Sequence, residues 1–323
     1  MSAIERKIVF LDRDTLSPDT ILKPFSFPHQ LTIYNQTTAE QVLSRIDGAD
    51  IVITNKTPIR DNAIVAAAGL KLVAVAATGT DVVDLAACAS RGVAVCNIRN
   101  YAVHTVPEHT IALILALRRS VVAYHNSIGR GRWEQAAQFC YFDYPIRDLA
   151  GSTIGIIGDG VLGRAVGRLA EAFGLKVLFA AYKDSRGMGP LYTPFDEVMR
   201  VSDIITLHCP LMPSTRGLIG KREFDLMARR PLLINTARGG LVDETELVQA
   251  LQDGRLGGAA FDVVTSEPPV PDHPFLQLLD LPNFILTPHV AWASREAVQG
   301  LADQLVDNIN AFAEGRPFNQ VET

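Results

Sequence analysis

The sequence predicts an α/β protein with two doubly wound parallel-sheet domains. Short β-branched runs recur along the chain and alternate with longer stretches of helical periodicity, which is typical of βαβ units and parallel sheets. The runs form two series, separated by a strongly apolar stretch at 106–124. Because 323 residues exceed the usual size of one domain, we expect each series to build its own sheet.

The expected strands are short apolar runs rich in valine and isoleucine. The first series comprises 7–11, 31–34, 51–54, 72–76 and 93–96. The second series comprises 153–157, 176–180, 203–207, 232–236, 258–263 and 284–287.

Two helices set the expected domain boundaries. The stretch 106–124 should be buried on nearly every side, because 111–117 is entirely apolar. The last helix, 294–314, is ended by Gly315 and Pro317, and we expect this unpaired terminal helix to cover the first domain. The predicted domains are 1–103 plus 293–323, which is discontinuous in sequence, and 104–292.

The composition argues against several functional classes. The chain has 30 basic and 35 acidic side chains and a net charge of −5, which disfavours sequence-independent nucleic-acid binding. No run reaches ~18 uninterrupted apolar residues, and the charged start lacks the features of a signal peptide. Four cysteines without paired spacing predict reduced thiols, and His208-Cys209 lacks further ligands at useful spacing. We therefore expect a cytoplasmic protein with no membrane association and no metal site.

A glycine-rich turn directly follows the expected strand 153–157 and opens a helix. It has the form G-x-G-x-x-G, with Gly158 for a tight turn, Gly160 for close approach of a pyrophosphate and Gly163 for helix–strand packing. The helix N-terminus adds free N–H groups and a positive dipole. The motif predicts that the second domain is a Rossmann dinucleotide-binding domain. The first domain lacks such a turn and is expected to hold the substrate across a cleft.

Three polar residues follow expected strands of the second domain, at the edge where parallel sheets hold ligands. Arg238 lies on a short turn, and a guanidinium suits a carboxylate because two parallel N–H donors match its two oxygens. Pro268 favours an extended backbone at Glu267, and Pro288 restricts the approach to His289. Alone, this glutamate is more typical of a solvated carboxylate and this histidine of a turn residue. Beside Arg238 and the glycine turn, they predict an acid–base pair next to a carboxylate anchor and a hydride carrier.

Several distant segments resemble the D-isomer-specific 2-hydroxyacid dehydrogenases, and within them the glycerate dehydrogenase or hydroxypyruvate reductase branch. The similarity covers essentially the whole chain. The segments are 76–81 (AATGTD), 106–109 (VPEH), the glycine turn, 235–240 (NTARGG), 266–269 (SEPP) and 288–292 (PHVAW). The resemblance implies an NAD(P)-dependent oxidoreductase that interconverts small 2-oxo acids and D-2-hydroxy acids, such as glyoxylate, hydroxypyruvate and glycerate.

The resemblance also implies site residues. Arg238 would bind the substrate carboxylate and carbonyl, His289 would donate and accept the proton, and Glu267 would be its partner. The implied substrate-binding residues are Asn55, Lys56, Ala77, Thr78, Gly79, Arg238 and Trp292. The expected cofactor-binding residues are Gly158, Gly160, Val161, Leu162, Gly163, Tyr182, Lys183, Cys209, Pro210, Thr215, Thr236, Ala237, Asp262 and Ala291, with Asp262 as the nicotinamide anchor.

These roles imply a mechanism for reduction. The nicotinamide would deliver hydride to C2 while protonated His289 gives its proton to the forming alkoxide. Glu267 is expected to stabilise the imidazolium, so that the acid form persists near neutral pH. Closure of the domains would exclude water.

The preference between NAD and NADP depends on the loop after the expected strand 176–180. An NAD-preferring site usually has an acid about 20 residues beyond the glycine turn, and here that position is Ala181. Lys183 and Arg186 lie close enough in sequence to meet a 2′-phosphate, and Asp184 could still reach the ribose hydroxyl. The sequence predicts relaxed selectivity, with NADP used within about tenfold of NAD.

The sequence also gives expectations for the oligomeric state and the substrate size, and it leaves alternative functions to consider. The segment 133–144 is unusually aromatic and predicts a symmetric homodimer, and Trp292 should narrow the pocket for small polar substrates. The main alternative is an NAD(H)-sensing binding protein of the corepressor type, which usually carries longer ends. Formate dehydrogenases resemble the same fold but have Gln where this chain has Glu267, and phosphoglycerate dehydrogenases carry a C-terminal regulatory domain.

Overall fold

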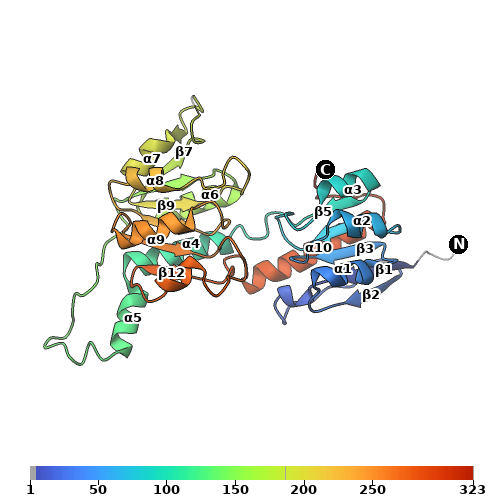
Figure 1. Ribbon diagram of the computed structural model, residues 1–323, viewed down its shortest axis with the longest axis horizontal. Coiled ribbons are helices and arrows are strands. Elements are labelled where there is room, and N and C mark those ends of the chain that lie inside the picture. Colours follow the sequence, from blue (N-terminus) through green and yellow to red (C-terminus); the bar gives the residue numbers. More distant parts are fainter. Residues whose placement is uncertain (1–4, 186, 323) are drawn as a thin grey trace. The chain divides into compact units, whose positions relative to one another are not determined.

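The computed structural model describes residues 5–185 and 187–322 and divides the chain into two compact units. Unit 1 comprises 1–101 and 293–323, and unit 2 comprises 102–292. Each unit contains a parallel sheet with helices around it, as the sequence predicts (Figure 1). No helix in the described part of the chain is long and apolar enough to span a membrane.

Unit 1 holds a sheet of five parallel strands in the order β2-β1-β3-β4-β5 within the described residues. The strands are β1 (Arg6–Phe10), β2 (His29–Ile33), β3 (Ile51–Thr54), β4 (Leu72–Val75) and β5 (Ala94–Cys96). The helical elements are η1 (Arg13–Thr15), α1 (Ala39–Ile46), α2 (Asp61–Ala66), α3 (Leu85–Arg91) and α10 (Arg295–Ala313). Every residue of β3 and β4 is buried, because helices cover both faces of the sheet.

The long helix α10 closes unit 1 from the far end of the sequence. Ser294 caps it by accepting the N–H of Ala297 at 3.2 Å, and the helix lies against β4. Its buried residues repeat at helical spacing, so one face of the helix is apolar. They include Val298, Leu301, Leu305, Val306 and Ile309.

Unit 2 holds a sheet of seven parallel strands in the order β12-β11-β10-β9-β6-β7-β8, counted over 102–185 and 187–292. The strands are β6 (Thr153–Ile157), β7 (Lys176–Ala180), β8 (Tyr192–Thr193), β9 (Ile204–Leu207), β10 (Leu232–Asn235), β11 (Gly258–Phe261) and β12 (Phe284–Leu286). The helical elements are α4 (Thr105–Arg118), α5 (Val121–Gly129), α6 (Val161–Ala172), α7 (Phe195–Val201), α8 (Lys221–Leu226), α9 (Glu244–Gln252) and η2 (Pro274–Leu278). The two-residue strand β8 is too short to be seen in the sequence pattern.

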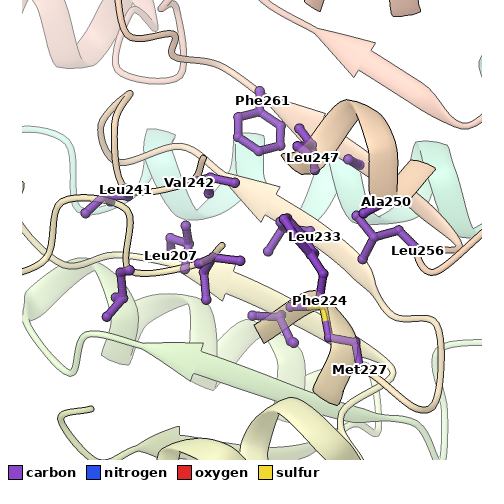
Figure 2. Close-up of a cluster of buried hydrophobic side chains, with 14 of the residues drawn as sticks. Leu207, Phe224, Met227, Leu233, Leu241, Val242, Leu247, Ala250, Leu256 and Phe261 are labelled. Atoms are coloured by element: carbon purple, nitrogen blue, oxygen red, sulfur yellow. The ribbon is translucent and has the colours of Figure 1, made fainter. Parts of the chain in front are cut away.

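Successive residues of one strand pack into different cores of unit 2. Leu207, Leu233 and Phe261 join the cluster under α8 and α9, which Figure 2 shows from close by. Ile234 and Ala260 belong to a second cluster, against α4 and α6 on the other face. This alternation fixes the register of the strands, because a shift of one residue would exchange the two cores.

The helix expected at 106–124 is divided in two. Helix α4 ends at Arg118, and Ser120 has a left-handed backbone with φ of +51°. Its hydroxyl donates to the carbonyl of Pro145 at 2.7 Å, which ties this bend to the end of a long excursion, 130–147. The expectation of one continuous helix is therefore wrong. The hydrogen bond at the bend joins residues 25 positions apart, so the local sequence pattern does not reveal it.

Candidate active site

The glycine turn lies at the carboxyl end of β6, where a side chain has no room. Gly158 has φ of +104°, and a Cβ on it would lie 2.6 Å from the carbonyl carbon of His208. A Cβ on Gly163 would lie 1.9 Å from the carbonyl oxygen of Gly158. Strand, turn and helix therefore press together at both positions, which a larger residue would prevent.

The third glycine faces open space instead. A Cβ on Gly160 would meet no protein atom within 4 Å, and Val161, the first residue of α6, is 54% exposed. No side chain caps the N-terminus of this 12-residue helix, so its first N–H groups and its positive dipole remain available. The turn fits the pyrophosphate of a dinucleotide, which needs close approach to backbone N–H groups at a helix start.

The Arg238 turn follows β10, and Glu267 lies in the loop that follows the neighbouring strand β11. Asn235 is fully buried, and its side-chain amide donates to the carbonyl of Arg238 at 2.8 Å while its oxygen accepts the N–H of Ala237 at 3.0 Å. One guanidinium nitrogen of Arg238 donates to the carbonyl of Ala237 at 2.8 Å. These bonds hold the arginine at the carboxyl edge of the sheet with a defined backbone.

His289 and Glu267, which the sequence predicts to be an acid–base pair, lie in direct contact. Nδ1 of His289 lies 2.6 Å from Oε2 of Glu267, and the two side chains are 24% and 33% exposed. The other oxygen of Glu267 accepts the N–H of Val264 at 3.2 Å, which orients the carboxylate. Because the glutamate engages Nδ1, Nε2 of the imidazole is left to face a substrate.

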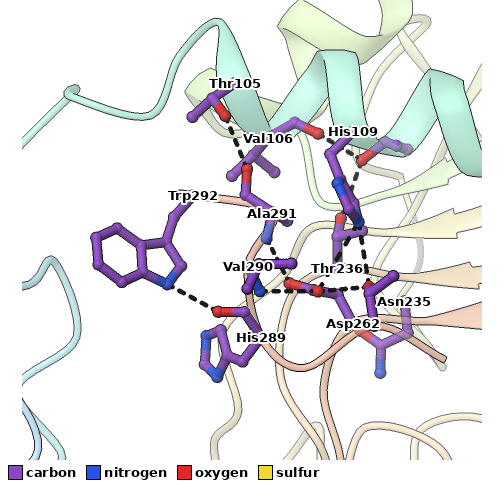
Figure 3. A network of polar contacts seen from close by, with 12 residues as sticks. Thr105, Val106, His109, Asn235, Thr236, Asp262, His289, Val290, Ala291 and Trp292 are labelled. Atoms are coloured by element: carbon purple, nitrogen blue, oxygen red, sulfur yellow. Dashed lines mark hydrogen bonds and ion pairs between the residues drawn. The ribbon is translucent and has the colours of Figure 1, made fainter. Parts of the chain in front are cut away.

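His289 itself lies on a turn that depends on Asp262. The histidine has φ of +54°, and its N–H donates to the carbonyl of Asp262 at 2.8 Å. The carboxylate of Asp262 is 1% exposed and accepts the hydroxyl of Thr287 at 2.6 Å and the N–H groups of Val290 and Ala291 at 2.9 and 2.8 Å (Figure 3). Asp262 therefore organises the turn that presents the histidine, a role that its sequence position did not reveal.

Two residues of α4 support the same turn, as Figure 3 shows. The hydroxyl of Thr105 donates to the carbonyl of Ala291 at 3.0 Å, and Nε2 of His109 lies 3.2 Å from the hydroxyl oxygen of Thr287. The indole N–H of Trp292 donates to the carbonyl of His289 at 2.9 Å. His109 lies in the VPEH segment, and that motif was the only sequence signal for this support.

A pocket of about 450 Å³ opens beside the histidine–glutamate pair. Its walls are otherwise mostly apolar, including Val264, Leu279 and Leu286. A volume of this size is in the ordinary range for small-molecule sites. Apolar walls lower the local dielectric and strengthen the hydrogen bond between His289 and Glu267.

The other expected cofactor residues follow neighbouring strands at this edge. Tyr182 and Lys183 follow β7, Cys209 and Pro210 follow β9, and Thr236 follows β10. The Thr236 hydroxyl lies 3.0 Å from that of Thr110, and Thr215 donates to the carbonyl of Pro210 at 2.7 Å. Burial raises the pKa of the Cys209 thiol to about 11 and lowers the pKa of the neighbouring His208 to about 4.

Lys183 has a partner that the sequence did not suggest. Its ammonium group lies 2.8 Å from Oε1 of Glu223, which is 2% exposed. Burial opposes ionisation of Glu223, but hydrogen bonds from Lys183 and Arg222 outweigh it and lower the pKa of the carboxyl group. Asp184 has φ of +63°, and Arg186 lies outside the described residues. The lysine is thus engaged by this glutamate, while Tyr182 is 69% exposed.

In unit 1, the expected substrate residues gather at the carboxyl ends of β3 and β4. Asn55 and Lys56 follow β3, and 77–79 follow the neighbouring β4. The carboxylate of Asp12, after β1, accepts the N–H groups of Asn55, Lys56 and Thr57 at 2.9, 2.7 and 2.7 Å. This buried aspartate, 4% exposed, shapes the loop and has no sequence motif that announces it.

Within the described residues, no group of three or more His, Cys, Asp or Glu side chains could hold a metal ion. His289 with Glu267, the Arg238 turn and the glycine turn all lie at the carboxyl edge of the sheet of unit 2.

Comparisons with known proteins agree with this geometry. Residues 111–291 match the family model described as D-isomer specific 2-hydroxyacid dehydrogenase, NAD binding domain. The chain is 54% identical to a glycerate dehydrogenase of Methylorubrum extorquens, over 98% of this chain and 99% of the relative. It is 38% identical to a hydroxypyruvate reductase of Blautia hydrogenotrophica, over 98% and 99% of the two chains. A D-lactate dehydrogenase of Aquifex aeolicus, solved with NAD and lactic acid, superimposes with a TM-score of 0.79 at 26% identity over 96% of each chain.

Proposed function

The chain belongs to the D-isomer-specific 2-hydroxyacid dehydrogenases, NAD(P)-dependent enzymes, and we propose that it interconverts glyoxylate or hydroxypyruvate and the corresponding 2-hydroxy acid. The observation that carries the proposal is the 2.6 Å contact between His289 and Glu267, beside the turn that holds Arg238. The names of the two relatives support a small polar substrate for this chain as well.

The roles of the site residues follow from their chemistry. The nicotinamide cofactor, when bound at the turn 158–163, supplies or accepts a hydride. Arg238 binds the carboxylate of the 2-oxo acid through its guanidinium fork. Nε2 of His289 donates a proton to the substrate oxygen as negative charge develops there. Glu267 holds Nδ1, fixes the orientation of the ring and stabilises the imidazolium before the proton is given up.

Supporting residues position this set. Asp262 orders the turn that carries His289, and in our proposal it also serves the nicotinamide amide. The loops of unit 1 at Asn55, Lys56 and 77–79 contribute substrate contacts, so unit 1 is proposed as the substrate domain and unit 2 as the cofactor domain.

A homodimer and a cytoplasmic location are part of the proposal. Phe139 and Phe142 are 86% and 82% exposed and Trp133 is 50% exposed, on an excursion that extends from unit 2 (Figure 1). Aromatic side chains this exposed are typical of a surface that another copy covers. All four cysteines are free thiols, as expected in a reducing compartment. A particle near the monomer mass of 35.1 kDa in light scattering at micromolar concentration would contradict the dimer.

A panel of 2-oxo acids tests the proposed reaction. Purified protein is mixed with NADH or NADPH and with glyoxylate, hydroxypyruvate, pyruvate or phenylpyruvate, and the nicotinamide absorbance is followed. We expect the highest kcat/KM for glyoxylate or hydroxypyruvate, because we propose that the indole of Trp292, which donates to the carbonyl of His289, narrows the space for the substrate. Efficient turnover of phenylpyruvate with poor turnover of hydroxypyruvate would contradict the substrate assignment.

A further inference from the structure

A second pocket of unit 2 lies at the amino ends of the strands, away from the catalytic turns. Its volume is about 290 Å³, at the lower end of the range for small-molecule sites. Leu232 begins β10, Asp203 immediately precedes β9 and Gly257 immediately precedes β11, and all three line the pocket. The catalytic turns follow the carboxyl ends of these same strands, so the two sites lie at opposite edges of one sheet.

The lining of this pocket is strongly positive. Four arginines and one aspartate line it, a surplus of three positive charges in a chain whose net charge is −5. They are Arg118, Arg147, Arg229, Arg230 and Asp203. We call this site the arginine pocket.

The single acid of the arginine pocket is already engaged. Asp203 accepts the N–H of Thr153 at 2.9 Å and a guanidinium nitrogen of Arg229 at 3.3 Å. The nearby Asp148 pairs with Arg119 at 2.9 Å, and neither of these residues lines the pocket. Asp203 and Asp148 also attract the charge of Arg118, whereas Arg147 and Arg230 form no ion pair among the described residues.

Arg118 shows that these charges oppose one another. Its guanidinium donates to neutral acceptors, the carbonyl of Asp148 at 3.0 Å and the hydroxyl of Ser152 at 2.6 Å. Burial lowers the pKa of this half-buried arginine, the negative charge of Asp203 raises it in part, and the positive charge of Arg147 lowers it. An anion between the two guanidinium groups would remove this repulsion.

We propose that the arginine pocket binds a phosphate group, either as inorganic phosphate or as part of a small phosphate ester. Planar guanidinium groups match the oxygens of a phosphate through paired N–H donors, and several around one pocket neutralise a multiply charged ligand. The pocket is too small for a dinucleotide and lies at the edge opposite the glycine turn, so the proposal does not depend on the proposed substrate.

The test measures binding, with the cofactor site already filled. Inorganic phosphate and glycerol phosphate are titrated separately into the protein by calorimetry, with NADH at saturation so that the glycine turn is occupied. We expect one site per chain for either probe, with affinity that falls as potassium chloride is raised. Tighter binding of the ester would support a metabolite as the ligand, and tighter binding of the free ion would support inorganic phosphate.

Charge-removing variants locate the site. Arg147→Gln combined with Arg230→Asn removes two exposed charges of the lining, and asparagine tolerates the φ of +50° at position 230. We expect phosphate affinity to fall by at least about tenfold. Turnover of hydroxypyruvate should be unchanged, since both residues lie far from the catalytic edge. Arg91→Gln combined with Arg295→Gln, two exposed arginines of unit 1, is the matched control and should bind as the parent does.

Three results would overturn the proposal. They are the absence of phosphate binding in the parent, equal affinity in the pocket variant, and an equal loss in the control variant. If the pocket variant keeps its phosphate affinity and also dissociates into smaller particles, the arginines contact a second copy of the chain instead.

Discussion

The two sheets differ in the residue that the chain places in the turn after their first strand. In unit 1, β1 lies between β2 and β3, and in unit 2, β6 lies between β7 and β9 in the same arrangement. After β1 the chain places the carboxylate of Asp12, which accepts three N–H groups of the turn after β3. After β6 it places Gly158, packed against the backbone of His208 in the turn after β9.

This difference decides which sheet can take a dinucleotide. The edge of unit 1 is satisfied by an anion that the chain itself supplies. In unit 2 the carboxylate two residues beyond β6 is Asp159, which accepts the hydroxyl of Tyr192 and a guanidinium nitrogen of Arg164. The start of α6 has no side-chain cap, so its N–H groups are left for an external phosphate. One fold can thus serve as a binding domain or as a scaffold, depending on a few residues at one turn.

The largest effect should come from the proton donor at the open edge of unit 2. His289→Ala is expected to lower kcat for hydroxypyruvate by about two to four powers of ten, because it removes the imidazole that we propose as the general acid. NADH binding, measured by fluorescence, should be retained. The matched control is His125→Ala, an exposed histidine of α5, which should keep full activity. Near-normal turnover in a folded His289→Ala protein would remove the histidine from the mechanism.

The next prediction tests whether the open space beside Gly160 receives the cofactor. Gly160→Ala adds a Cβ that meets no protein atom, so the melting temperature should hold while KM for NADH rises by about 10- to 100-fold. Gly300→Ala in α10 adds the same group in equally open space, and it should leave KM unchanged and slightly stabilise the helix. If both variants bind NADH like the parent, the open space at Gly160 does not receive the cofactor.

A third experiment removes the carboxylate that accepts the turn N–H groups in unit 1. Asp12→Ala leaves the N–H groups of 55–57 without their acceptor and should lower the free energy of unfolding by about 1–3 kcal/mol. If the comparison between the two edges holds, added sulfate should stabilise this variant more than the parent, because an external anion can now replace the carboxylate. The exposed Asp14→Ala is the control and should respond to sulfate as the parent does. If sulfate stabilises Asp12→Ala and the parent equally, an external anion does not replace the carboxylate in unit 1, and the comparison with the glycine turn of unit 2 fails.

The smallest effect concerns the choice of cofactor. We expect the parent to use NADPH within about tenfold of NADH in kcat/KM, since Ala181 carries no charge to repel a 2′-phosphate. Glu223→Gln weakens the hold on Lys183, so the NADPH to NADH ratio should rise by up to about tenfold. The exposed Glu171→Gln on α6 should leave the ratio unchanged. A parent that favours NADH a thousandfold would mean that loop shape, not charge, sets the selectivity.

The sequence predicts those parts of this molecule that depend on local pattern. Alternating strand and helix periodicity predicts both parallel sheets, and the structure and the solved relatives confirm that fold class. The motifs around Arg238, Glu267 and His289 predict the family, which the comparisons confirm, whereas the individual roles of these residues stay predictions.

The features that the sequence did not predict depend on contacts between distant positions. Asp12 acts on residues 43 to 45 positions away, Asp262 acts on residues 25 to 29 positions away, and Lys183 pairs with Glu223, 40 positions away. An aspartate after a strand has no local signal that distinguishes a loop organiser from a ligand contact. Such roles become visible only when the sheet order is known.

The return of α10 to unit 1 has a consequence for the order of folding during synthesis. The five strands of unit 1 leave the ribosome first, but the helix that packs on β4 follows only after the 191 residues of unit 2, 102–292. At about 5–20 residues per second, that gap lasts roughly 10–40 s. Unit 2, continuous in sequence, can complete its core in that time, while unit 1 waits with one apolar face uncovered. We therefore expect the nascent chain to pass through a state in which unit 2 is folded and unit 1 still exposes the apolar surface that α10 covers.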